Sequence, residues 1–161
     1  MTLGPEFFST EIFRETESVL FYDASFPNTN GCDVVKHGPG AVSPPDKNGH
    51  QQFYVHSEQV DRNLCVWGTR TFYLINLIWP EPYHEIHLDD HSGAIVIPAG
   101  CFHRSVSGEN GSVLINLPQR SPFFDSKIEF IPVSTEDNDL LRDVITHETP
   151  VVWKKGVRVS K

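Results

Sequence analysis

The chain has 161 residues, close to the size of one domain, and 39% of them are hydrophobic and 21% charged, as in a folded globular protein. We therefore expect a single domain over residues 1–161. Twenty-one acidic residues against thirteen basic ones give a formal charge of -8, which argues against a nucleic-acid partner held by charge. No segment approaches the ~20 apolar residues that span a bilayer, so we expect no membrane partner either.

The chain has three cysteines, an odd number without a Cys-x-x-Cys spacing: Cys32, Cys65 and Cys101. This pattern predicts neither a disulfide framework nor a zinc ribbon, and we interpret the cysteines as reduced thiols of a cytoplasmic protein. The first thirty residues carry four glutamates and lack a continuous apolar stretch, so we expect no signal peptide.

Short alternating or apolar runs broken by turn residues extend from residue 53 to 132, the pattern of an all-β sandwich or barrel. The predicted strands are Gln52–His56, Asn63–Trp67, Thr71–Trp79, Tyr83–Leu88, Ala94–Ile97, Val113–Leu117 and Lys127–Val133. Residues 30–49 are rich in Gly, Pro, Asp and Asn and are predicted to form a loop leading into the barrel. We place the barrel core at about 50–133, after an N-terminal arm of residues 1–49.

The C-terminal part, residues 134–161, has a helix signature. Ser134-Thr135-Glu136-Asp137 is a capping pattern, and four apolar residues follow it at helical spacing, which predicts a short helix from about Thr135 to Ile145. Val151–Trp153 is predicted to return as an edge strand, and Lys154–Lys161 to form a solvated tail.

A first motif lies at the start of the predicted barrel. Tyr54-Val55-His56 is followed by four residues, Asp61, six residues and Gly68, and Gly49 precedes it. A known pattern, Gly, five residues, His-x-His, three or four residues, Glu, six residues, Gly, has the same order. Here a tyrosine replaces the first His, an aspartate replaces the Glu, and Gly49 stands one residue nearer.

A second motif follows in the same barrel. A second known pattern runs Gly, five residues, Pro-x-Gly, two residues, His, three residues, Asn. Here Gly93 is followed by four residues, Pro98-Ala99-Gly100, two residues and His103, and Ser107 stands in place of the Asn. Together the two motifs resemble those of the cupin superfamily. The resemblance implies an all-β cupin jelly-roll barrel, to which the chain adds the short C-terminal helix.

Strand parity places the motif side chains together. Residues two apart on a strand face the same side, so Tyr54 and His56 share a face that the resemblance directs into the barrel. Asp61 begins the next strand and can approach His56, while His103 enters from a distant strand. Two imidazoles and one carboxylate suit one divalent metal ion (Fe, Mn, Zn or Ni) with open positions, or a metal-free acid/base pair.

Among cupins, the single leading His56 and the run Ile97–His103 look most like the deoxysugar-nucleotide 3,5-epimerases. That branch removes a proton next to a ketone with a His base and no metal. The resemblance implies that His56 is the base and His103 an orienting residue of the pocket, and the phenol of Tyr54 could donate a proton. The chain departs from the branch in lacking its Arg-Gly before the base and its lysine on the next strand.

We therefore expect a small-molecule enzyme with isomerase- or epimerase-like acid/base chemistry on a carbonyl or sugar-nucleotide compound. The first alternative is a metal-dependent cupin, a dioxygenase or lyase, in which His56, Asp61 and His103 hold the metal. The second alternative is a non-catalytic cupin that binds a small molecule. Small cupins often pair, so we expect a homodimer.

Other residues near the motifs have both a functional and a structural interpretation. Trp67, Arg70 and Arg104 are candidate substrate contacts, the two arginines for an anionic group. A third histidine, His87, lies in a His-rich run but alternates with Ile86 and Leu88. If that apolar pair faces inward, His87 faces water and has no functional role.

Overall fold

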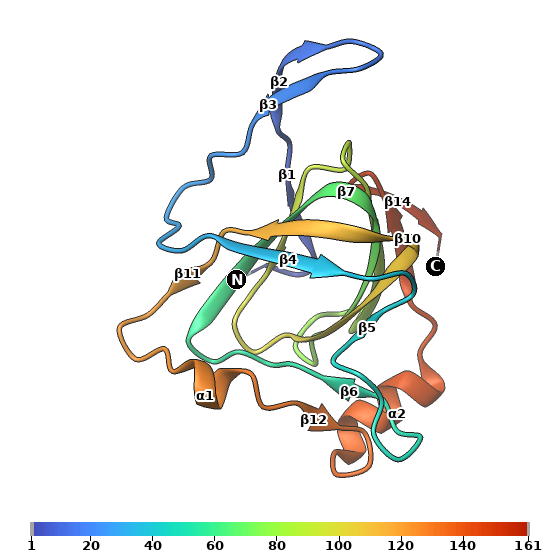
Figure 1. Cartoon of the computed structure of the whole chain (residues 1–161). Coiled ribbons are helices and arrows are strands. Elements are labelled where there is room, and N and C mark those ends of the chain that lie inside the picture. The colour runs from blue at the N-terminus through green and yellow to red at the C-terminus, as the bar shows by residue number, and fades with distance from the viewer. Residues whose placement is uncertain (1, 161) are drawn as a thin grey trace.

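The computed structural model describes residues 2–160, about half of which lie in strands and few in helices, so the predicted all-β class is confirmed (Figure 1). The strands are β1 (Glu6–Phe8), β2 (Glu11–Glu15), β3 (Leu20–Asp23), β4 (Asp33–His37), β5 (Val42–Ser43), β6 (Gln52–Phe53), β7 (Gln59–Ile75), β8 (Tyr83–Leu88), β9 (Ala94–Ile97), β10 (Phe102–Asn116), β11 (Gln119–Arg120), β12 (Val133–Ser134), β13 (Val151–Lys154) and β14 (Val157–Ser160). The helices are α1 (Ser126–Glu129) and α2 (Asp139–His147). Neither helix in this described range has the length and apolar character needed to cross a bilayer.

Strands β7 and β10 form the frame of the barrel. They pair antiparallel along almost their whole length, from Phe102 opposite Ile75 to Asn116 opposite Asn63. The first half of β7 also pairs with β9 and its second half with β8, while β10 pairs with β4 and β5. Because neighbouring halves of these strands pair with different partners, the sheet curls around a central space (Figure 1).

A bend at Gly68 lets β7 run on where the sequence predicts two strands and a turn. Gly68 has a φ of 72°, which glycine adopts without steric cost, and the register with β10 shifts between Ser107 and Ser112. Residues 108–111, which also carry turn chemistry, lie inside β10. The predicted break between Asn63–Trp67 and Thr71–Trp79 is wrong, because Gly68 and residues 108–111 lie at a bulge in a continuous pair of strands.

Regular alternation is the pattern that the sequence predicts best. Strands β8 and β9 have the predicted bounds. In β8, Ile86 and Leu88 are buried while the side chain of His87 is 38% exposed, so the predicted outward direction of His87 is confirmed.

The predicted strand Lys127–Val133 is wrong. The Asp125 carboxylate accepts a hydrogen bond from the Lys127 amide at 2.9 Å and caps the short helix α1 in its place. Val133 alone of that range is in a strand, opposite Phe53 of β6. The predicted loop over residues 30–49 is also partly wrong, because β4 and β5 lie in it and pair with β10.

The C-terminal helix is confirmed, although it starts later than predicted. Asn138 is its N-cap, with a side-chain oxygen that accepts a hydrogen bond from the Leu141 amide at 2.9 Å. The predicted strand Val151–Trp153 is confirmed as β13, which pairs in parallel with β8, but it lies inside the sheet and not at its edge. The predicted solvated tail is wrong, because β14 folds back and pairs with β13.

The core beneath β8 contains a buried histidine, His84. Its Nε2 donates to the Glu81 carbonyl at 2.8 Å, and its Nδ1 accepts from Trp153 Nε1 at 3.0 Å, so the ring is held neutral. Burial lowers the pKa of His84 below its ordinary 6.5, Arg158 acts in the same direction, and the carbonyl and charge of Glu81 oppose both. The folded chain therefore resists protonation at a site that the unfolded chain protonates readily.

This gives a prediction for stability against pH. Above about pH 6.5 neither state is protonated at His84, and as the pH falls below that value the unfolded state binds the extra proton, so the free energy of unfolding decreases. Denaturant unfolding between pH 7.5 and 5.5 should show a smaller decrease for His84→Gln than for wild type. Since other histidines titrate in this range, the difference between the two proteins is the quantity to measure. An equal decrease in both would contradict the assignment.

Candidate active site

A cavity of about 280 Å³ lies inside the curled sheet. Its walls come from the inner faces of β4, β7 and β10, from the segment before β7, and from Phe130, which follows α1. Both sequence motifs contribute side chains to it. The cavity is therefore where the chain's candidate functional residues meet.

Backbone hydrogen bonds join the two motifs. The Tyr54 amide donates to the His103 carbonyl at 2.9 Å, and the His103 amide donates to the Tyr54 carbonyl at 2.8 Å. The Gly100 amide donates to the His56 carbonyl at 2.8 Å. The predicted strand Gln52–His56 is shorter than expected, because β6 ends at Phe53. Beyond it, Tyr54 forms an isolated β-bridge with His103 of the second motif.

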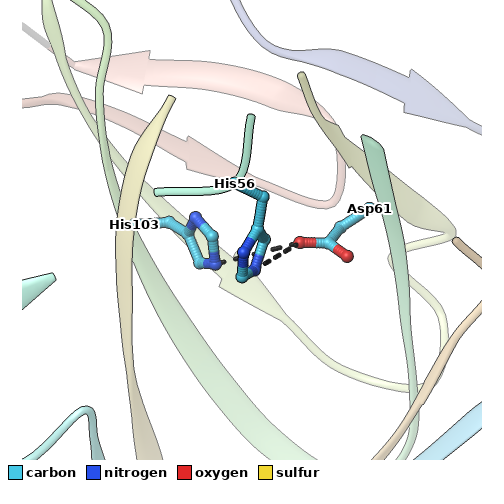
Figure 2. A group of neighbouring side chains, drawn as sticks. All are labelled: His56, Asp61 and His103. Carbon is cyan, nitrogen blue, oxygen red and sulfur yellow. Dashed lines mark ion pairs between the residues drawn. The ribbon is translucent and has the colours of Figure 1, made fainter. Parts of the chain in front are cut away.

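The structure brings the side chains of His56, Asp61 and His103 together (Figure 2). Asp61 Oδ2 lies 3.6 Å from His56 Nε2 and 3.8 Å from His103 Nε2. The two imidazole centroids are 4.9 Å apart, and all three side chains are buried. These separations are longer than hydrogen bonds, so the three groups face one another across a small gap.

Carbonyl groups fix the tautomer of both histidines. His56 Nδ1 lies 2.8 Å from the Glu129 carbonyl, and His103 Nδ1 lies 3.2 Å from the Cys101 carbonyl. Because a carbonyl oxygen only accepts, each Nδ1 carries the proton and each neutral ring has an unprotonated Nε2. Both Nε2 lone pairs therefore face the gap.

Asp61 is anchored in a similar way. Its Oδ1 accepts hydrogen bonds from Gln59 Nε2 at 2.6 Å and from Asn116 Nδ2 at 2.7 Å. This leaves Oδ2 directed toward the imidazoles. Three acceptor atoms thus converge, and among residues 2–160 none of the hydrogen bonds places a donor between them. A proton on one imidazole, or a cation bound between the three atoms, would supply the missing positive partner.

The three residues fit a divalent metal ion. Their ligand atoms all lie within 4.8 Å of one another. Bond lengths of ~2.0–2.1 Å in a tetrahedral zinc site place neighbouring ligand atoms about 3.4 Å apart, so small side-chain rotations would suffice. Hydrogen bonds that hold the far atoms of the ligands, as at His56 Nδ1 and Asp61 Oδ1, are typical of metal sites.

The environment of His103 keeps it neutral. Burial lowers the pKa of His103, Asp61 raises it, and His56 lowers it again. The net shift is downward, so His103 holds an available lone pair near pH 7.

The fold resembles solved structures of sugar-modifying enzymes. ChmJ, a 3'-monoepimerase from Streptomyces bikiniensis in complex with dTDP-quinovose, has a TM-score of 0.61 and 14% identity, over 91% of this chain and 78% of that one. The QdtA 3,4-ketoisomerase from Thermoanaerobacterium thermosaccharolyticum, a double mutant in complex with TDP, has a TM-score of 0.58 and 15% identity, over 88% and 92%. NovW, a 4-keto-6-deoxy sugar epimerase of Streptomyces spheroides, has a TM-score of 0.56 and 17% identity, over 74% of this chain and 64% of that chain.

The chain has a cupin jelly-roll fold. The fold expected from the two motifs is thereby confirmed. The sequence matches no protein-family model and no curated protein. At these identities the structural likeness shows the fold of the chain alone, and its chemistry has to be argued from the site.

Tyr54 lies on the wall of the cavity beside both imidazoles. Its ring centroid is 6.3 Å from that of His56, nearly parallel to it, and 6.2 Å from that of His103. Phe130 packs edge-on against His56, with centroids 5.0 Å apart. The imidazoles therefore have aromatic neighbours that limit their rotation and exclude water.

The three candidate substrate contacts lie in different places. Arg70 lines the cavity. Trp67 is 54% exposed, next to the bulge, and does not line the cavity. Arg104 follows the inward-facing His103 on β10, so it faces the other side, where it pairs with Asp46 at 2.8 Å. We assign no substrate contact to Trp67 or Arg104.

Sequence reasoning missed the residues that hold the site in place. The Glu129 carboxylate accepts hydrogen bonds from the Ser57 and Glu58 amides at 2.8 and 3.1 Å, which fixes the chain beside His56. Glu129 stands between the apolar residues Ile128 and Phe130, within the range Lys127–Val133 that was predicted to be a strand. Gln59 is two residues before Asp61, so the two face the same side of β7, and a predicted strand that began at Gln59 would have identified it. Nothing local in the sequence points to Asn116.

Proposed function

We propose that this cupin catalyses proton transfer at a carbon next to a carbonyl group, in an isomerase- or epimerase-like reaction on a small molecule. The observation that carries the proposal is the pair of unprotonated Nε2 atoms, on His56 and His103, that face one buried cavity. A general base needs an available lone pair within reach of the proton it removes. Both histidines meet that requirement, and the cavity gives a substrate access to them.

The chain's own residues supply the steps. His56 Nε2 takes the proton from the carbon, and the electron pair moves into the carbonyl as an enolate. Asp61, 3.6 Å away, stabilises the imidazolium that forms. Return of the proton to the other face of the carbon gives an epimer, and its delivery to a neighbouring position gives an isomer. The Tyr54 phenol can donate a hydrogen bond to the carbonyl and a proton to the enolate, while the unprotonated Nε2 of His103 can act only as an acceptor.

The comparisons support this proposal. ChmJ is a 3'-monoepimerase, QdtA a 3,4-ketoisomerase and NovW a 4-keto-6-deoxy sugar epimerase, and the names of QdtA and NovW describe reactions of keto compounds. A sugar nucleotide or another small carbonyl compound is therefore the substrate class that we propose for this chain.

Deuterium exchange tests the proposal even when the product of the reaction is unknown. In D₂O the wild type should incorporate deuterium next to the carbonyl of TDP-4-keto-6-deoxyglucose or of one of a panel of short keto acids, followed by proton NMR. His56→Ala should not. If no compound of either kind exchanges, while at least one of them binds, the chain is the non-catalytic binding cupin of the second alternative.

A second candidate function is a metal-dependent reaction at the same residues. It is favoured by the convergence of three acceptor atoms with anchored far sides. His56, Asp61 and His103 would hold the ion, which would supply Lewis-acid polarisation of a carbonyl oxygen.

The remaining predictions, a homodimer and a cytoplasmic location, stay predictions.

Metal removal separates the two candidates. Under the acid/base proposal, dialysis against a chelator leaves the rate of deuterium exchange unchanged, because the imidazoles act directly. Under the metal alternative, elemental analysis finds about one divalent ion per chain in wild type, none in His56→Ala, and the rate falls with chelation. A chelator-sensitive rate would contradict the acid/base proposal.

A further inference from the structure

Arg70 is a buried arginine in the wall of the cavity, 2% exposed. Its Nε donates to Ser112 Oγ at 2.8 Å, and its Nη1 lies 3.4 Å from both Ser105 Oγ and His37 Nε2. Its Nη2 is buried and has no hydrogen-bond partner within residues 2–160. Neutral groups therefore position the guanidinium and leave part of it unpaired.

No carboxylate of the described residues forms an ion pair with Arg70. The two carboxylates that line the same cavity are engaged elsewhere, because Asp33 pairs with Arg120 and Asp61 faces the imidazoles. Burial lowers the pKa of Arg70 to about 10, which leaves it protonated at neutral pH. A buried charge is costly unless it is paired, so this end of the cavity holds one unmatched positive charge.

His37 adds a second unpaired donor beside Arg70. Because Arg70 Nη1 can only donate, His37 Nε2 accepts and His37 Nδ1 carries the proton. That Nδ1 is buried and without a partner in the described part of the chain. Burial and then the charge of Arg70 lower the pKa of His37, so the ring stays neutral. Unpaired N–H groups next to a positive charge are what an anion requires.

Two other buried arginines help to show why the position of Arg70 matters. Arg62 and Arg104 also carry unpaired nitrogens, but neither lines the cavity. Arg104 pairs with Asp46, and Arg62 donates to Gln119 at 3.3 Å. Arg70 combines an unpaired nitrogen and an unmatched charge with a place where a ligand can enter.

We propose that the cavity takes a compact carbonyl compound with an anionic group, a carboxylate or a phosphate, which binds between Arg70 and His37. This inference rests on the proposed function and names the class of its substrate. The planar guanidinium matches either anion with two parallel hydrogen bonds.

The spacing along β10 sets the length of the ligand. Ser105, which contacts Arg70, is two residues from His103 on the same inner face, about 7 Å along the strand. An anion held at Arg70 therefore places a carbon several bonds away beside His103. The cavity of about 280 Å³ is at the lower end of the roughly 300–1,000 Å³ of small-molecule pockets, so the ligand is compact.

NMR titration of the wild type with sodium acetate and with inorganic phosphate tests the anion site without turnover. At least one of them should shift the resonances of cavity residues saturably, and the tighter binder assigns the group as a carboxylate or a phosphate. Arg70→Met keeps an unbranched apolar stem and removes the charged guanidinium. It should weaken binding about tenfold to a hundredfold, the worth of a charged hydrogen bond. The matched control Arg62→Met should bind like wild type.

The stability of the variant distinguishes binding from a structural role. Without an anion, Arg70→Met loses the hydrogen bonds to Ser112 and Ser105 but also the unpaired buried charge, so it should unfold at a temperature close to that of wild type. If that variant does not fold, Arg70→Lys retains the charge without the planar fork and should still weaken binding. Absence of binding to wild type, or equal binding to the Arg70 variants, would overturn the anion site. His56→Ala should bind the anion like wild type. Absence of deuterium exchange in wild type that still binds the anion would count against the proposed proton transfer alone.

Discussion

Replacing His56 with alanine should lower turnover by roughly 10²- to 10⁴-fold, the usual contribution of a general base. His56 presents an unprotonated Nε2 to the cavity because the Glu129 carbonyl holds its Nδ1 proton at 2.8 Å. Alanine removes the base and leaves the anion end of the cavity untouched. The rate of deuterium exchange on the substrate found by screening measures the effect, with folding checked by circular dichroism.

His87→Ala is the matched control for this experiment. His87 belongs to the same chemical class, but it lies on the outer side of β8, where it contacts Glu85 at 2.8 Å. Its replacement should leave turnover and metal content unchanged. Equal turnover of His56→Ala and wild type, with both folded, would remove His56 from the mechanism.

The largest expected effect on stability is that of Gly68→Ala. A Cβ at Gly68 would lie 2.2 Å from the Gly111 carbonyl oxygen, which is backbone of the paired strand and cannot rotate away. The residue also has a φ of 72°, which costs an alanine about 1–2 kcal/mol. Because β7 and β10 would have to separate, we expect a loss of more than about 4 kcal/mol, the extreme of single substitutions. Denaturant unfolding measures it, and a poorly folded variant is the same result in stronger form.

Gly40→Ala separates the two causes. Gly40 also has a positive φ, 63°, but no atom lies within 4 Å of a Cβ built there. It should therefore lose only about 1–2 kcal/mol. Similar losses at both positions would mean that the contact with Gly111 does not constrain the pair of strands.

Local alternation made part of the fold predictable. Strands β8 and β9 alternate or run apolar between clear turns and have the predicted bounds. Strands β7 and β10 were divided in the prediction because Gly68 and residues 108–111 have the chemistry of turns. Whether such residues turn the chain or form a bulge depends on the partner strand, which is far away in sequence.

The site could be predicted where its residues follow a spacing rule. His56, Asp61 and His103 stand at motif distances, and the structure places them within one small group. Glu129 could not be found, because the apolar residues around it suggested a strand, whereas Ile128 and Ile131 are in fact 65% and 61% exposed. Its carboxylate is instead used by the amides of another segment, a contact between distant residues that no local pattern encodes.

The most direct test of the central claim is the tautomer of the two cavity histidines. Nitrogen-15 NMR of histidine-labelled protein near pH 7.5, assigned with His56→Ala and a His103→Ala variant, reports which ring nitrogen carries the proton. We predict a protonated Nδ1 and an unprotonated Nε2 for both His56 and His103, because the Glu129 and Cys101 carbonyls accept from Nδ1. A protonated Nε2 on both rings would contradict it, since neither lone pair would then face the cavity and neither base nor metal chemistry could begin there.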